Sequence, residues 1–428
     1  MPVSFRSVLL AVAPLLVSLG VLLIGTTLLG TLLSLRMDQE GVPVDHIGLI
    51  MALYSVGFVV GTRLCPNVVE MVGHIRAFAA FAAVASASAL VHALWLDEVT
   101  WAVLRMLTGF CMAFLITIVE SWLNARSANE VRGRVMSTYM IVTYLSAGSS
   151  QAFLWVTDPS GFALFAVVAI AVSLSLVPLA LARIESPPQI PGARLRLREL
   201  IRISPLGVAG CFGAGLILSA FNALAPVYAR GVEDSAEWVG QFMMITILAG
   251  FLLQLPVGRL SDRFDRRRVI LGLTAATAVT GLLIALLGQV SVWILLPLIV
   301  LYSGFSLTLY PISLSHANDY LTPSQLVPAS AGLLLCYGVG AIAGPVAASW
   351  VMGRLGNDGL FYYIAAVSVL LSAFTAWRMT RRQSLPNEEQ GAFVAVPQTT
   401  PVVVELDPRY EPVDDDQLSF DFDVRETG

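Results

Sequence analysis

Long segments without charged residues are the feature that most constrains how this chain can fold. A helix that crosses the hydrocarbon core of a bilayer needs about 20 apolar residues, because each residue advances it by about 1.5 Å. Hydrophobic residues make up 57% of the chain and charged residues only 13%, and the mean hydropathy is +0.78. These values lie outside the usual range of soluble domains. The sequence therefore predicts an all-α, polytopic membrane protein.

Twelve such segments can be counted, six in each half of the chain. In the first half they cover residues 7–35, 46–62, 77–96, 99–122, 135–157 and 159–182. In the second half they cover residues 203–229, 238–258, 269–287, 291–314, 326–353 and 359–377. The predicted regions are a six-helix bundle at 1–182, a cytoplasmic linker at 183–203, a second six-helix bundle at 204–379 and an acidic, disordered cytoplasmic tail at 380–428.

The arginines predict how the helices are oriented. The chain has 25 basic residues, all of them arginine, and nineteen lie in the loops and chain ends on one side of the predicted bundle. The loops of the other side hold only Arg36, Arg230 and Arg354. Because cytoplasmic loops collect positive charge during insertion, we expect both termini to be cytoplasmic, in a multi-pass protein of the cell inner membrane.

The two halves show a weak internal repeat. Residues 109–127, GFCMAFLITIVESWLNARS, align with residues 304–322, GFSLTLYPISLSHANDYLT. The alignment sets Glu120 opposite Ser315 and lies where a duplication of six helices would place it. The repeat favours two related bundles over a single array of twelve helices.

A charged loop follows the eighth segment. Residues 258–267, GRLSDRFDRR, resemble the loop signature G-x-x-x-D-R-x-G-R-R of the major facilitator superfamily, with Asp265 where the second glycine is usual. RMLTG, which begins at Arg105, is similar to the R-x-x-x-G motif of that family. The resemblance implies two parallel six-helix repeats with substrate bound between them. It also implies a gate motif that consists of Gly258, Asp262, Arg263, Arg266 and Arg267.

Three further segments narrow the resemblance. VESWLN at 119–124, LYP at 309–311 and the run 333–345 are similar to the YcaD-like bacterial branch of the major facilitator superfamily. The loop at 66–74, which corresponds to the charged loop of the second half, keeps less of the signature. The similarity implies a transporter and names no substrate.

Two charges lie inside predicted helices, where burial of a charge costs about 2.5 to 3.5 kcal/mol on insertion scales. Arg105 is either a cavity-facing cation, which binds an anionic group or assists proton transfer, or an arginine that bridges helices or reaches the interface. Glu120 is either a proton carrier or the partner of Arg126, Arg134 or a loop arginine of the second half. Arg105 and Glu120 are therefore candidates for a proton or charge relay.

Neutral polar residues predict the lining of a cavity. The third, sixth, ninth and twelfth segments, which form the outer scaffold of the resembled fold, have no Asn, Gln, Asp, Glu, Arg or Lys in their interiors. The other segments do contain polar side chains, although each of these can instead join two packed helices by a hydrogen bond. The candidates for substrate contact are Asn222, Tyr144, Gln151 and Tyr310.

The eleventh segment contains the pattern G-x-G-x-x-x-G-P. Proline removes one backbone hydrogen bond from a helix, and glycines allow close helix contact. We therefore predict a hinge at Gly340, Gly344 and Pro345. The pattern resembles the antiporter motif G-x-x-x-G-P but lies in the other half, so symport, antiport and uniport all stay open.

Other chemistry is not indicated. The four cysteines form no C-x-x-C pair, the four histidines have no metal-ligand spacing, and the sequence has no glycine-rich phosphate loop. We expect no metal, no cofactor, no nucleic acid partner and no enzymatic activity.

The predicted function is a secondary active transporter that moves a small polar or amphipathic solute by alternating access. We expect it to be a monomer in the lipid bilayer, driven by a proton or solute gradient, and to keep its activity when the acidic tail is deleted. The alternative is a membrane receptor or assembly factor that has the scaffold of a transporter without transport activity.

Overall fold

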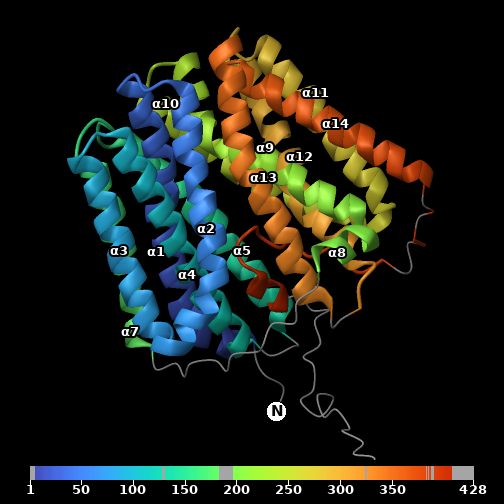
Figure 1. Cartoon of the computed structure of the whole chain (residues 1–428), viewed down its shortest axis with the longest axis horizontal. Helices are drawn as coiled ribbons and strands as arrows, with labels where there is room; N and C mark the ends of the chain where they lie inside the picture. Colours follow the sequence, from blue (N-terminus) through green and yellow to red (C-terminus); the bar gives the residue numbers. More distant parts are fainter. Residues whose placement is uncertain are drawn as a thin grey trace, which may run out of the picture.

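The computed structural model describes residues 5–127, 131–182, 196–322, 325–381, 383, 385–386 and 390–406. Within these residues the regular structure is all helical (Figure 1). The first half contains α1 (Phe5–Gln39), α2 (Val44–Val72), α3 (His74–Leu94), α4 (Glu98–Arg126), α5 (Arg132–Ser150), the 3₁₀ helix η2 (Gln151–Trp155), α6 (Ala163–Leu174) and α7 (Leu176–Leu181). The second half contains α8 (Leu197–Ile203), α9 (Pro205–Val232), α10 (Ala236–Arg263), α11 (Arg266–Leu287), α12 (Val292–Asn318), α13 (Leu326–Leu355) and α14 (Gly359–Arg381), followed by η5 (Pro401–Leu406).

Eleven helices of the described chain are long and apolar enough to cross a membrane, with α6 and α7 counted as one. The predicted count of twelve differs by one, at the fifth segment. There α5 is rich in serine, threonine and glycine, and the helix continues as η2 after Ser150. Polar side chains lower the hydropathy of this segment although it occupies the place of a membrane helix, so the all-α polytopic fold is as predicted.

Several helices begin at a side chain that caps the backbone. Asp97 accepts a hydrogen bond from the Thr100 amide at 2.9 Å, and this bond lowers the pKa of the Asp97 carboxyl. Ser235 and Ser291 accept amide bonds at the starts of α10 and α12. Such caps satisfy amides that the helix itself leaves without a partner. They define where the chain re-enters the bundle after each turn.

The helices pack mainly with helices of their own half. In Figure 1 the blue to teal α1, α2, α3 and α4 lie on one side, and α11 and α14 lie on the other. In the first half α4 packs against α2 and α3, and α1 against α5 and α6. In the second half α13 packs against α9, α11 against α14, and α12 against α10. We call the side of the bundle where α1 begins and α14 ends the terminal face, and the other side the opposite face.

The two halves meet near the opposite face. Arg230 of α9 forms an ion pair with Asp38 of α1 at 2.7 Å. One turn or more deeper, the Ser34 hydroxyl donates to the Ala223 carbonyl oxygen at 2.7 Å. Further contacts join α2 to α13 and α10 to α5 and η2. The bundle is therefore closed at this face.

Glycines bring α9 and α13 into backbone contact. A Cβ added at Gly344 would overlap the carbonyl oxygen of Leu216, and one added at Gly340 would overlap that of Phe212. These glycines, expected to act as a hinge with Pro345, therefore pack one helix against its neighbour, and α13 is a continuous helix through Pro345. The hinge stays a prediction.

Gly344→Ala should destabilise the protein by about 1 to 3 kcal/mol, because the new methyl group must push two helices apart. Thermal unfolding of the purified protein in detergent measures this as a lower midpoint. Gly272→Ala is the matched control, since nothing lies within 4 Å of a Cβ at that exposed helical position. Equal midpoints for the two variants would contradict close packing at Gly344.

Candidate functional site

A cavity of about 1350 Å³ lies between the two halves. Its wall is formed by α1, α2, α4 and α5 of the first half, by α8, α9, α10, α12 and α13 of the second, and by the segment after α14. It extends from Arg105, which lies closer to the opposite face, to Asn67 and Glu70 at the end of α2 on the terminal face. The cavity is thus directed toward the terminal face.

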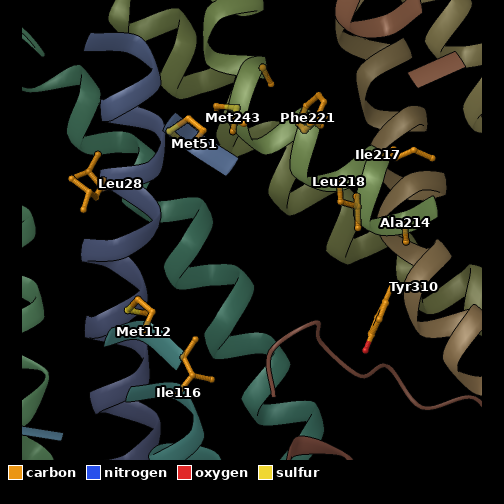
Figure 2. Packing of buried hydrophobic residues seen from close by; sticks show 14 of the residues in the cluster. Leu28, Met51, Met112, Ile116, Ala214, Ile217, Leu218, Phe221, Met243 and Tyr310 are labelled. Atoms are coloured by element: carbon orange, nitrogen blue, oxygen red, sulfur yellow. The ribbon is translucent and has the colours of Figure 1, made fainter. Parts of the chain in front are cut away.

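Apolar side chains form much of the wall. In Figure 2 Met112 and Ile116 of α4 lie on one side of the space and Leu218 of α9 on the other, with Met51 and Met243 toward the closed end. Unbranched methionine side chains adapt to ligands of different shape. A solute in this cavity would contact apolar side chains of both halves.

Arg105 supplies a positive charge at the deep end. Its guanidinium carbon lies 4.6 Å from the centroid of the Tyr54 ring, and its side chain is buried, with the residue 7% exposed. The Nε atom has no hydrogen-bond partner, and no carboxylate of the described residues forms an ion pair with Arg105. A cation in this state can accept an anionic group from the cavity.

The R-x-x-x-G pattern explains how Arg105 is positioned. A Cβ at Gly109 would overlap the carbonyl oxygen of Tyr54, and one at Gly57 that of Met106. Glycine at both contacts lets α4 approach α2 to backbone distance, as small residues do in membrane helix pairs. Arg105, one turn before Gly109 on α4, therefore lies over the Tyr54 ring.

Two of the four predicted contact residues line the cavity. Asn222 is exposed between buried neighbours on α9, and Tyr144 of α5 stacks on Phe251 with ring centroids 5.0 Å apart. Their contact with a substrate stays a prediction.

The other two predicted contact residues, Gln151 and Tyr310, lie outside the cavity lining. Gln151 is fully buried in η2, where its Nε2 donates to the Ser150 hydroxyl at 3.1 Å. Tyr310 is 2% exposed and makes a T-shaped contact with Tyr337, with ring centroids 5.2 Å apart. Both lie outside the lining, because hydropathy assigns a residue to a segment but not to a face of the helix.

None of the ten α2 residues that line the cavity was predicted from the sequence. These residues recur every three or four positions, which is the period of one helix face. That periodicity is present in the sequence and could have identified the α2 residues that line the cavity. They are Met51, Tyr54, Ser55, Phe58, Val59, Thr62, Arg63, Pro66, Asn67 and Glu70.

Glu120 is fully buried and its partners are hydroxyl groups. Tyr139 of α5 donates to Oε1 at 2.6 Å, and the hydroxyls of Thr399 and Thr400 donate to Oε1 and Oε2. An arginine partner was one of the two alternatives for Glu120, and within the described residues Glu120 forms no ion pair. The threonines lie so far along the chain that no local pattern could have indicated them.

The predicted gate motif lies at the end of α10 and the start of α11. Arg266 forms an ion pair with Asp319, and Arg267 pairs with Asp265 at 2.8 Å, both in the second half. Asp265 also accepts the Arg267 amide at 3.0 Å, so the residue that departs from the family signature caps α11.

The remaining members of the motif border the segment after α14. Asp262 accepts a bond from the Phe393 amide at 2.7 Å, Gly258 faces the Phe393 ring, and Arg263 ends α10. A gating role for this motif stays a prediction.

Alignments with related sequences cover most of the chain. An uncharacterized MFS-type transporter of Yersinia pestis is 28% identical over 392 residues, which cover 89% of this chain and 98% of the relative. The uncharacterized MFS-type transporter YcaD of Escherichia fergusonii is 25% identical over 375 residues, which cover 86% and 95%.

Solved structures share the fold. The nucleoside transporter NupG superposes with a TM-score of 0.72 at 14% identity, covering 88% of this chain and 100% of that one. A D-xylose-proton symporter superposes with a TM-score of 0.67 at 14% identity, covering 89% and 99%. The family model of the Major Facilitator Superfamily matches residues 15–252 and 234–406. Since this match spans both halves and the cavity between them, the chain belongs to the major facilitator superfamily.

Proposed function

We propose that this chain is a secondary active transporter that moves a small amphipathic solute by alternating access. The observation that carries the proposal is the cavity between the halves, closed at the opposite face and directed toward the terminal face. In this fold a rocking motion of two halves around a central site exposes it to each side in turn. The arginine distribution supports a cytoplasmic terminal face, so this would be an inward-facing state of an inner-membrane transporter.

The solute carries an anionic group in this proposal. Burial of the Arg105 guanidinium is costly because no carboxylate of the described residues pairs with it, and a carboxylate or phosphate of the solute would supply the opposite charge and further hydrogen bonds. The Tyr54 and Tyr144 rings and the methionine side chains would contact an apolar or aromatic body beside that group. Asn222, on α9 of the second half, would bind a polar substituent of the solute.

Proton coupling through Glu120 forms the second part of the proposal. Glu120 is a membrane-buried carboxylate held by neutral hydroxyl donors, so it can gain or lose a proton without the loss of an ion pair. It lies on α4, the helix that also carries Arg105. The structure of a D-xylose-proton symporter with this fold is consistent with such coupling.

Arg105→Gln should raise the half-saturation concentration for an organic anion about tenfold to a hundredfold, because charge-assisted hydrogen bonds contribute about 1.5 to 3 kcal/mol. Solute counterflow in proteoliposomes, screened with anionic, neutral and cationic compounds, measures the change.

Arg354→Gln is the matched control, since Arg354 also lies over an aromatic ring, that of Trp350 at 4.5 Å, and is outside the cavity lining. A transported solute whose half-saturation concentration is the same in Arg105→Gln and Arg354→Gln would refute anion recognition. Absence of flux for the whole panel, with the protein folded, would favour a receptor or assembly role.

Glu120→Gln should reduce uptake driven by a pH gradient to background while solute-for-solute exchange continues, because exchange needs no net proton movement. Glu237→Gln, at an exposed carboxylate in the first turn of α10 and outside the cavity lining, should keep both activities. The measurement is uptake with and without an imposed pH gradient. Full gradient-driven uptake by Glu120→Gln would exclude it as the proton site.

A further inference from the structure

The chain returns to the cavity after α14 has ended. Residues 390–406, which we call the C-terminal strap, extend along the terminal face and end in η5, the dark red turn next to α5 and α13 in Figure 1. This region lies within the tail for which the sequence predicted disorder, and residues 390–406 make contacts with both halves. Residues 407–428 lie outside the described residues.

One end of the strap is bound to the second half. The Gly391 amide donates to the Asp319 carboxylate at 3.2 Å, and Arg266 donates to the Gly391 carbonyl oxygen. The Phe393 amide donates to Asp262 at 2.7 Å, and the Phe393 ring occupies the space beside Gly258. The strap therefore uses the charged groups of the loop signature as its attachment points.

The other end of the strap is bound to the first half. The Thr399 and Thr400 hydroxyls donate to Glu120, and η5 packs against α4 and α5 of the first half as well as against α13 of the second. Val396 and Val403 are 2% and 1% exposed, so the strap also buries apolar side chains. Hydrogen bonds to a buried carboxylate are among the stronger ones in proteins.

These contacts place the strap across the mouth of the cavity. Gln398, Thr399 and Pro401 form part of the cavity wall at the terminal face. A segment bound to Asp262 on one half and to Glu120 on the other joins the halves on the side that must close during alternating access. It also shields Glu120 from proton exchange with the cavity.

We propose that the C-terminal strap is an autoinhibitory plug. While bound, it holds the two halves apart at the terminal face and occupies the path of the solute, and its release permits the transport cycle. This inference rests on the proposed transport function, and it adds that the chain regulates its own site. It replaces the expectation that removal of the tail has no effect on transport.

The first test compares two truncations in solute counterflow. Deletion of residues 390–428 removes the strap, whereas deletion of 407–428 removes only the chain after it and serves as the matched control. We expect the longer deletion to increase the initial rate about tenfold over the control, because release no longer requires rupture of bonds to charged groups. An equal or lower rate would overturn the proposal, with thermal unfolding as the check that both proteins are folded.

The second test needs no transport. Hydrogen exchange followed by mass spectrometry should show slow exchange at Gly391 and Phe393 in the full chain, since both amides are bonded to carboxylates. The double variant Thr399→Val and Thr400→Val, nearly isosteric, should accelerate exchange throughout 390–406, and Thr380→Val at the exposed end of α14 should not.

The two tests separate the proposals. Exchange at the rate of an unfolded peptide in the full chain would overturn the plug. Slow exchange together with no flux from any truncation or solute would leave the strap bound on a protein that is not a transporter, and so would refute the proposed function and, with it, autoinhibition.

Discussion

The bilayer offers the backbone no water to bond with, and every structural feature of this chain is subject to that constraint. Each membrane segment must satisfy its amides and carbonyls within a helix, and charged side chains are displaced to the helix ends. Two charges, Arg105 and Glu120, remain inside. Each has a partner made of protein: an aromatic ring for the first and three hydroxyl groups for the second. Helix packing supplies these partners. The fold therefore determines the surroundings of the two charges on which the proposed chemistry depends.

Helix association in a membrane depends on close packing, since lipid tails are as apolar as the side chains they replace. Glycine supplies this packing between α2 and α4, at Gly57 and Gly109, and between α9 and α13, at Gly340 and Gly344. These pairs are each within one half. Contacts between the halves concentrate near the opposite face, which leaves a space between the halves toward the terminal face. The cavity is thus a consequence of where backbones can touch.

The two halves have unequal tasks although they resemble each other in outline. The first contains both membrane charges, while the second contains the more complete copy of the loop signature, with Asp265 in place of one glycine. The C-terminal strap connects these features, since it contacts Glu120 in one half and Asp262 and Arg266 in the other. The strap therefore joins the two halves at the terminal face through different groups on each side.

Hydropathy alone determined that this chain is an all-α membrane protein, and the charged loop at Asp262 and the pattern at Arg105 indicated its family. Those properties belong to single segments, so they can be inferred from order in the sequence. Which face of a helix meets the cavity depends on neighbours, and this is why Asn222 and Tyr144 line it while Gln151 and Tyr310 do not. The partners of Glu120 were beyond any sequence argument: Thr400 is 280 residues away, and only tertiary packing, which brings distant segments to one carboxylate, could decide that contact.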